Sequence, residues 1–224
     1  MSAVATASRS ELVQKARQFP AGRFTLWGAV LAAVGAAAFL WVLAAGGAPR
    51  AWQAWHVNFM FWTGLAQALV VFAATQKLAK GHWSGLIIRL AEAAAAFLWV
   101  SLVLYVGLIV GRAHIFSWLH EPRPDLGGWL TAKSFFLRNG LIYLLLTWLS
   151  WRFVRYDLAP DIRELAEGRP ADRLEGRDAI MRNAAWLVVA YAFGYSLLAF
   201  ELVMSLAHKW VSNLFGALDR KSVV

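Results

Sequence analysis

Long apolar runs alternate with short polar segments along the chain, and this pattern predicts membrane-spanning helices. Five runs reach the roughly 20 residues that a helix needs to cross a hydrocarbon core of about 30 Å. We place them at residues 24–46, 56–78, 84–111, 134–154 and 179–206. The first run is longer than the apolar part of a secretory signal, about 7–15 residues, so we expect an uncleaved helix. The expected fold class is therefore all-α, a polytopic bundle of transmembrane helices.

The basic residues between the runs predict an orientation, because short cytoplasmic loops retain Lys and Arg. Fourteen of them fall in the N-terminal arm and in the second and fourth connections with their flanks, against six on the other side. We therefore expect a cytoplasmic arm at 1–23, a multi-pass bundle at 24–217 in the inner (plasma) membrane, and an outer segment at 112–133. Pro160 and the following DIRELAE indicate either a short surface helix or a solvated charged loop.

The composition agrees with a membrane protein. Of the 224 residues, 60% are hydrophobic and 16% are charged, and the mean hydropathy is +0.52. The 13 tryptophans cluster near span ends, as expected at membrane–water interfaces. The net charge of +9 is spread over short segments and forms no contiguous basic face, so we expect membrane lipid and no nucleic acid as a partner.

The absence of cysteine restricts the redox chemistry of the chain. Without cysteine it can hold no thiolate-ligated iron–sulfur cluster, no Cys-ligated zinc and no haem attached through a C-x-x-C-H motif. A haem held by two histidines is not expected either, because His56 alone lies in or at the edge of a span. We therefore expect no metal on this chain, so haem and iron–sulfur clusters would belong to partner subunits.

Ionisable side chains within a span are costly, so they pair, face the bundle interior or line a pathway. Arg89 and Glu92 lie three residues apart on one helical face, and we expect them to pair in the cytoplasmic half. This pair is either structural or part of a proton relay. Gln67, Tyr191 and Tyr195 are expected to lie between the two sides of the bundle, where they can hydrogen-bond across it.

A second polar group is expected near the outer side, because the spans alternate in direction. It consists of His56, Asn58, Arg138, Asn139 and Glu201. Such a cluster can bind a quinone head group, whose carbonyls need donors and whose redox chemistry needs a proton acceptor such as His or Glu. The alternative is interhelical hydrogen bonding with snorkelling to the interface. We expect Glu201 to be unpaired and able to exchange a proton, whereas Arg89 would keep Glu92 ionised.

Several segments, taken in order, resemble the second membrane subunit of alternative complex III. They are WHVNFMFWTGLAQALVVFAA (55–74), RLAEAAAAF (89–97), WLHEPRP (118–124), SFFLRNGLIYLLLTW (134–148) and FELVMSLAHKWVSNLFGA (200–217). That complex is a quinol:cytochrome c oxidoreductase with two related polysulfide-reductase-type (NrfD-like) membrane proteins. The resemblance covers roughly residues 20 to 217 and is a pattern across the chain, without a single diagnostic motif.

The resemblance implies a protein of about ten spans, built from two four-helix bundles and flanking helices, of which this chain would be the N-terminal half. It also implies a quinone or menaquinone ligand and a set of partners: a sister NrfD-like membrane subunit, an iron–sulfur protein and c-type cytochromes. The family's Asp-Pro-His-Trp sequence after the fifth span is replaced by residues 207–210, Ala-His-Lys-Trp. An acidic group expected there is absent, and the sister subunit is the better candidate for the quinol site.

The last residues also indicate a fragment. Residues 200–217 lead towards a sixth span that does not follow, and residues 219–224 can be encoded by a common short-read sequencing adapter. We expect 218–224 to be an artefactual tail. The predicted function is a membrane subunit of a quinol-oxidising complex, not catalytic alone, that contributes to quinone binding or proton translocation. The alternatives are a secondary transporter, although no interrupted span is expected among the five, and a structural scaffold.

Overall fold

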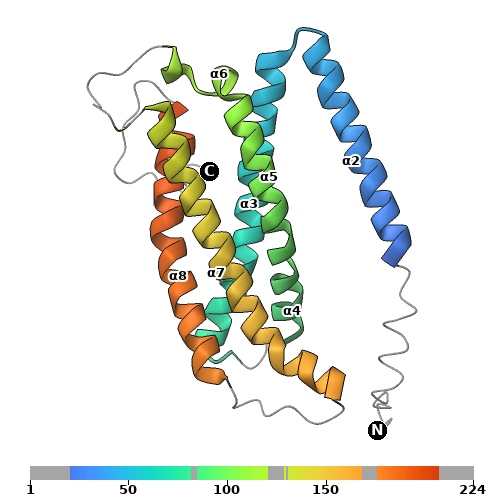
Figure 1. Ribbon diagram of the computed structural model, residues 1–224, viewed down its shortest axis with the longest axis vertical. Helices are drawn as coiled ribbons and strands as arrows, with labels where there is room; N and C mark the ends of the chain where they lie inside the picture. The colour runs from blue at the N-terminus through green and yellow to red at the C-terminus, as the bar shows by residue number, and fades with distance from the viewer. Residues whose placement is uncertain (1–20, 82–84, 121–128, 130, 168–175, 207–224) are drawn as a thin grey trace, which may run out of the picture. The chain divides into compact units, whose positions relative to one another are not determined.

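The computed structural model describes residues 21–81, 85–120, 129, 131–167 and 176–206, and these residues are helical apart from short connections (Figure 1). The expected all-α fold class is confirmed. The chain divides into two compact units after Ala51, and each is described separately below.

The first unit contains α2, Ala21–Ala44. Its 24 residues give a helix of about 36 Å, enough to cross a hydrocarbon core. Its apolar side chains, such as Leu31, are exposed. After α2 the chain turns through Gly46, whose φ of +83° lies in the left-handed region that glycine adopts at little cost.

The second unit is a bundle of helices. They are α3 (Ala48–Leu78, which begins before the unit boundary), α4 (Gly85–Ala93), α5 (Ala95–Val110), α6 (Arg112–Ile115), α7 (Ala132–Glu167) and α8 (Arg177–Leu198), with short 3-10 turns at Ser117–Leu119 and Met204–Leu206. Between α8 and the last turn the chain forms one π-helical turn, Ala199–Val203. Within this bundle α7 lies beside both α5 and α8 (Figure 1).

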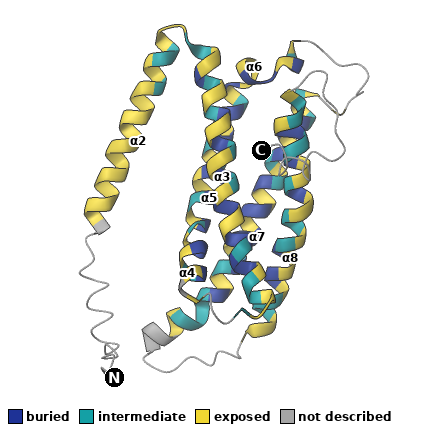
Figure 2. Ribbon diagram, turned by 180° about the vertical axis from the view of Figure 1, so that it is seen from behind, coloured by how far each residue is buried: buried dark blue, intermediate teal, exposed yellow. Residues whose placement is uncertain are grey.

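The bundle has a partly polar interior and an apolar outer surface. Its outward-facing surface carries exposed apolar side chains, whereas buried residues line the contacts between helices (Figure 2). The buried polar residues include Thr63, Gln67, Ser101, Thr147 and Ser150. Exposed apolar residues around a partly polar interior are what a lipid solvent favours, because lipid cannot satisfy hydrogen bonds.

Two groups of apolar side chains form the core of the bundle. One joins α3, α4 and α5 to α7 and α8 around small residues such as Ala73, Ala74 and Ala91, which allow close helix approach. The other is rich in aromatic rings and contains Phe59, Phe116 and others from α3, α5 and α7. Small residues therefore pack one part of the bundle, and aromatic rings pack the other.

Close approach between α3 and α5 depends on a glycine. At Gly107 the indole of Trp55 covers the backbone so closely that a Cβ would lie 2.5 Å from Trp55 Cζ2. The indole nitrogen of Trp55 also donates to the carbonyl of Leu104 at 3.1 Å. Gly107 therefore provides the space that lets this aromatic ring lie flat against α5.

The observed helices correct three predictions. Among the described residues, four helical segments are long and apolar enough to cross a membrane: Gly22–Ala44, Ala48–Leu78, Ile87–Val110 and Arg177–Leu206. The predicted run 134–154 is helical within α7, but polar residues such as Arg138 and Asn139 make it less apolar than the other four. The third span, Ile87–Val110, contains an irregular turn at Ala94, between α4 and α5, where the hydrogen bonding changes but the backbone stays helical at φ −62° and ψ −20°.

The third correction concerns the end of α7. The helix runs through Pro160 to Glu167, where a separate surface helix or a loop was expected. Proline removes one backbone donor from a helix and favours a kink, but it does not always end the helix. As a result Asp157 and Asp161 lie one turn apart on the same helix, and they enter the site described next.

Candidate functional site

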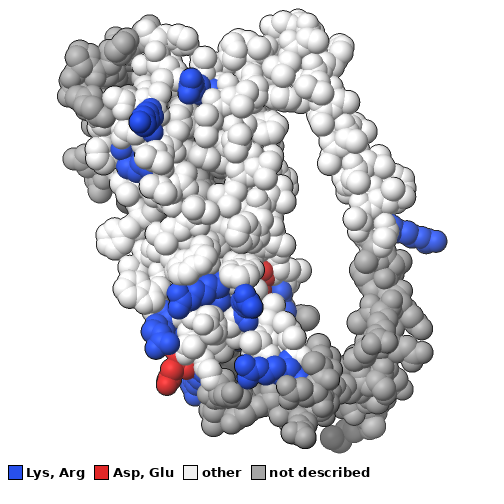
Figure 3. Space-filling view, in the orientation of Figure 1, with Lys and Arg blue, Asp and Glu red and all other residues white. Residues whose placement is uncertain are grey.

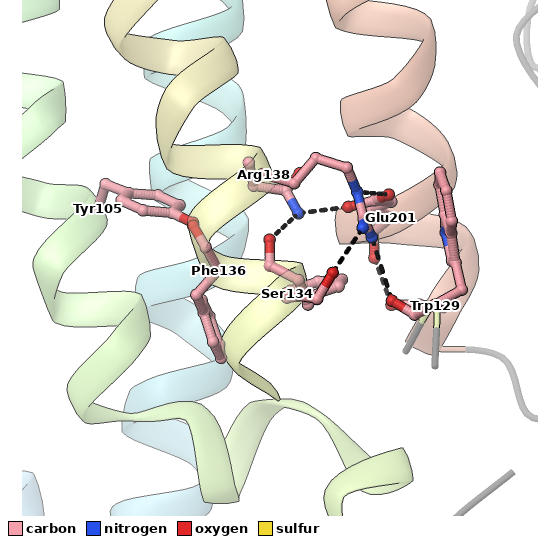
Figure 4. A network of polar contacts seen from close by, with 9 residues as sticks. Tyr105, Trp129, Ser134, Phe136, Arg138 and Glu201 are labelled. Atoms are coloured by element: carbon pink, nitrogen blue, oxygen red, sulfur yellow. Dashed lines mark hydrogen bonds and ion pairs between the residues drawn. The ribbon is translucent and has the colours of Figure 1, made fainter. Parts of the chain in front are cut away.

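Three of the five predicted outer polar residues meet at Glu201 (Figure 4). Arg138 Nε of α7 donates to Glu201 Oε1 at 2.6 Å, and Asn139 Nδ2 donates to Glu201 Oε2 at 2.5 Å. Glu201 is only 4% exposed, so both carboxylate oxygens are satisfied inside the bundle. We call these three residues the outer cluster. The prediction that Glu201 is unpaired was wrong, because Arg138 lies at the same depth and reaches it.

The remaining donors of Arg138 are also engaged (Figure 4). Nη1 donates to the Ser134 hydroxyl at 3.0 Å, and Nη2 donates to the Trp129 carbonyl at 3.3 Å. The guanidinium lies over the Trp129 ring, 4.0 Å from its centroid. The sequence predicted the depth of Arg138 in the membrane, but Ser134 was not predicted as its partner. A residue one turn earlier on the same helix is nevertheless well placed for such a contact.

Glu201 occupies the π-helical turn that follows α8. A π-helical turn contains an extra residue relative to an α-helix, and such turns often lie at functional sites. The Ser205 hydroxyl donates to the carbonyl of Glu201, one of the backbone acceptors near this irregular turn. The apolar periodicity of 179–206 carries no signal for this change in helix type.

The other two outer candidates are placed differently. His56 is buried, its ring centroid lies 5.6 Å from that of Phe116, and its Nε2 has no hydrogen-bond partner among the described residues. Asn58 is exposed and donates to the carbonyl of Ala54 on its own helix at 2.9 Å. The structure therefore does not bring Asn58 to the outer cluster, and no hydrogen bond joins His56 to it.

A second cluster forms where the carboxyl end of α3 meets α4 and the later part of α7, and we call it the inner cluster. Arg89 Nη1 donates to Glu92 Oε2 and to Asp157 Oδ2, both at 2.7 Å, and Arg89 Nη2 donates to Asp161 Oδ2 at 2.6 Å. Lys77 Nζ lies 2.8 Å from Asp157 Oδ1. The predicted pairing of Arg89 with Glu92 is confirmed, and the two aspartates were missed because α7 was expected to end earlier.

Inside the bundle the charges of the inner cluster balance. Glu92 and Asp157, only 2% and 4% exposed, face the cations of Lys77 and Arg89, whereas the side chain of the third carboxylate, Asp161, is 41% exposed. Loss of a buried pairing would leave a charge in little solvent, which favours uptake of a proton. Glu92 Oε1 has no hydrogen-bond partner among the described residues and is the oxygen best able to take that proton.

The environment of Asp157, beyond the apolar part of α7, favours Glu92 as the group that takes up a proton. Burial acts to raise the pKa of Asp157, but the contact with Glu92 and the charges of Lys77 and Arg89 outweigh it and hold the pKa below its ordinary value. Asp157 therefore stays ionised. Glu92, two residues before the irregular turn at Ala94, contacts a single cation, Arg89, among the described residues.

The two clusters lie a membrane thickness apart. Arg138 and Asp157 are separated by 19 positions of the same helix, which corresponds to about 28 Å along its axis. The hydrocarbon core of a bilayer is about 30 Å thick. The clusters therefore lie where the two borders of the hydrocarbon layer would be.

Buried polar side chains occupy the space between the clusters. Gln67 Nε2 donates to the Ser150 hydroxyl at 2.8 Å, and the Tyr195 hydroxyl donates to the Thr63 carbonyl at 3.3 Å. The predicted hydrogen bonding across the bundle is thus confirmed for Gln67 and Tyr195. For Tyr191 the contact observed is stacking on Tyr195, with ring centroids 4.7 Å apart. Polar groups accordingly continue along the bundle interior.

Two tyrosines extend this series towards the outer cluster. The Tyr105 hydroxyl donates to the Phe136 carbonyl at 2.7 Å, two residues from Arg138 (Figure 4). The Tyr105 and Tyr143 ring centroids lie 5.5 Å apart, and the Tyr143 hydroxyl donates to Met60 Sδ at 3.7 Å. Along α7, Asn139, Tyr143, Thr147 and Ser150 form one buried polar stripe, which explains the reduced hydropathy of this helix.

The structure offers these sites no metal ligand set. Among the described residues, no group of three or more His, Asp or Glu side chains is arranged to hold a metal ion. A pocket of about 190 Å³ lies between α3 and the irregular turn that joins α4 to α5. Its lining is apolar, with Trp62, Leu69 and Phe97 among the contributors, and none of the predicted site residues contributes to it.

The sequence matches no protein-family model, and neither a curated protein nor a solved structure matches it. The fold and the composition of the helices define an α-helical membrane protein. The resemblance to an alternative complex III subunit stays a prediction and enters below as part of a proposal.

Proposed function

We propose that this chain is an integral membrane subunit of a respiratory quinol:cytochrome c oxidoreductase of the alternative complex III type, where it contributes to proton translocation or quinone binding. The observation that carries the proposal is the pair of buried ionic clusters, about 28 Å apart along α7, with buried polar side chains in the space between them. Buried ionisable groups inside a membrane protein commonly mark pathways of ions or protons.

Proton movement is the role that the geometry supports best. In the inner cluster Glu92 can accept a proton if Arg89 moves away from it, because this carboxyl is buried and its Oε1 has no hydrogen-bond partner among the described residues. At the other border Glu201 can accept a proton if Arg138 moves away from it. Glu92 and Glu201 both lie at departures from regular α-helix, the first beside Ala94 and the second in a π-helical turn. Local changes in backbone geometry at these points would alter the pairing of each carboxylate.

Quinone binding has narrower support, at the outer cluster. Arg138 and Asn139 are donors of the kind that a quinone carbonyl needs, and Glu201 is an acceptor for the protons released by quinol oxidation. His56 adds a buried ring nitrogen without a partner. Since the chain has no cysteine, haem and iron–sulfur clusters would be held by partner subunits.

A secondary transporter is the second candidate. Transporters bind substrates at irregular points of spanning helices, and here the helical hydrogen bonding of the third spanning segment changes locally at Ala94, two residues after Glu92. No irregularity was expected there from the sequence. Substrate-dependent uptake by liposomes that contain the chain alone would favour this candidate over the respiratory subunit.

The test is purification of the tagged protein from its native membranes, followed by quinol:cytochrome c reductase assays normalised to c-type haem. We expect haem to copurify and Glu201→Gln to slow turnover without loss of haem. Asp178→Asn is the matched control, because Asp178 is an exposed carboxylate on the same helix. Purification without c-type haem, or equal activity in both variants, would contradict the proposal.

A further inference from the structure

The outward face of α7 carries two arginines held by aromatic rings. Arg152 lies between two residues one helical turn away on either side, with its Cζ 5.1 Å from the ring centroid of Trp148 and 5.9 Å from that of Tyr156. Arg155 Cζ lies 5.0 Å from the ring centroid of Trp151, also one turn earlier. These five residues form a basic aromatic patch.

The patch faces outward at the border of the hydrocarbon layer. All three of its rings are more than one-third exposed, and Asp157 of the inner cluster follows Tyr156 directly in α7. Trp99 of α5 packs edge-on against Trp151, with ring centroids 6.4 Å apart, which fixes one ring of the patch from a second helix. Tryptophan and tyrosine favour the depth of lipid head groups.

Neither guanidinium of the patch has an anionic partner within the part of the chain that the structure describes. Among the described residues, no carboxylate lies within ion-pair distance of Arg152 or Arg155. Basic side chains gather over the lower parts of α7 and α8 in Figure 3, whereas acidic side chains are few on that face. The patch therefore presents cations that are positioned but not neutralised.

A phosphate group is the anion that best complements this arrangement. Guanidinium groups bind phosphate oxygens through paired hydrogen bonds, and a ring-stacked arginine loses less freedom in doing so. At this depth the phosphate nearest to hand is that of a lipid, and exposed indole rings can pack against its glycerol and upper acyl chain.

We propose that Arg152 and Arg155, with Trp148, Trp151 and Tyr156, form a binding site for the phosphate head group of an anionic phospholipid. The site lies in the leaflet next to the inner cluster. Its place beside Asp157 would let a bound lipid support the end of α7 that carries the inner cluster. The inference needs only a membrane location and does not depend on the proposed respiratory function.

The test is a titration of the purified full chain in neutral detergent with phosphatidylglycerol, with bound lipid counted by native mass spectrometry. Salt is held at about 0.15 M, where charges more than about 8 Å away are largely screened. We expect Arg152→Gln/Arg155→Gln to weaken binding of the tightest lipid roughly 30-fold, from the loss of two basic contacts. Arg152→Lys/Arg155→Lys should recover part of this affinity, since the charge is kept and the stacked guanidinium is lost.

The matched control is Arg177→Gln/Arg182→Gln, which removes the same charge from exposed positions at the start of α8. We expect less than about a threefold change in the control, as is usual for exposed charges. Equal losses in both double variants would show that only net charge matters and would overturn the site. Competition by inorganic phosphate at the same concentration as the lipid would also overturn it, because the ligand would then be a soluble anion.

Discussion

Removing Arg89 should destabilise the bundle by leaving Glu92 as a buried carboxylate with no cation in contact. Arg89 contacts three carboxylates, but they do not depend on it equally. Asp157 keeps Lys77 at 2.8 Å, and the Asp161 side chain is 41% exposed, so water can replace the lost partner. The main cost of Arg89→Ala therefore falls on Glu92, which is 2% exposed.

The loss of unfolding free energy expected for Arg89→Ala can be estimated from these contacts. Breaking a buried ion pair by removing one partner costs about 3–5 kcal/mol. Because the Arg89 side chain is itself 35% exposed and Glu92 can take up a proton, we expect the low end, about 3 kcal/mol. In a Glu92→Gln background the same change should cost only about 1 kcal/mol, since no buried charge is left behind.

The assay is unfolding of the purified full chain in mixed micelles, followed by circular dichroism as denaturing detergent increases. Arg182→Ala is the matched control, because this exposed arginine lies at the same end of the bundle, and we expect a change within about 0.5 kcal/mol. The reasoning would be refuted if Arg89→Ala behaved like the control. It would also be refuted if the cost of Arg89→Ala were the same with and without Glu92.

Three further predictions concern other contacts of the bundle. In the same assay, Glu201→Gln and Arg138→Gln should each lower the free energy of unfolding by about 2 kcal/mol. The double variant should lower it by less than the sum of the two, because it leaves no buried charge without its partner. The pKa of Asp157 in the folded protein lies below its ordinary value of 3.8. The ion pairs of Asp157 therefore stabilise the protein above pH 3.8, and this stabilisation is lost as the pH falls through the lowered pKa. Asp157→Asn should reduce the free energy of unfolding at pH 7 and make the loss of stability below about pH 4 less steep. Gly107→Ala should lower stability by about 1–3 kcal/mol, because its Cβ would meet the Trp55 ring 2.5 Å away. Gly64→Ala, with open space at its Cβ, is the control and should be neutral or slightly stabilising. Equal shifts in melting temperature for the two variants would contradict the packing described.

The sequence predicts helix positions and membrane depth well, because both follow from runs of apolar residues. Alternation of span directions placed Arg138, Asn139 and Glu201 at one depth, and the structure joins them. Depth alone does not define which way a residue points. His56 and Asn58 have nearly the same depth, yet two positions correspond to about 200° around a helix, so one is buried and the other exposed.

The missed features depend on tertiary contacts and on helix irregularities. Asp157 and Asp161 were assigned to a connection because Pro160 suggested a break, although α7 continues and delivers both to Arg89. The π-helical turn at Glu201 and the irregular turn at Ala94 have no marker such as glycine or proline in the sequence. A reading of the sequence that assumes a regular helical period therefore cannot locate them.

The basic aromatic patch shows how the same sequence signal can have two meanings. The positive-inside pattern counted Arg152 and Arg155 only as topology markers. In the structure each guanidinium is positioned over a ring one turn earlier in α7, at the spacing of four residues that a helix requires. Both pairs precede Pro160 and lie in, or directly after, the predicted helix 134–154, so this spacing could have been found from the sequence.

We propose that buried carboxylates of this chain move protons during quinol oxidation, and the number of protons taken up per electron measures this. The complex purified through this chain is reconstituted into liposomes, and proton uptake is measured with quinol and cytochrome c as substrates. Glu92→Gln should lower the number of protons taken up per electron while quinol oxidation continues, and Asp178→Asn should leave it unchanged. An unchanged proton-to-electron ratio in Glu92→Gln, with an intact complex, would contradict the account.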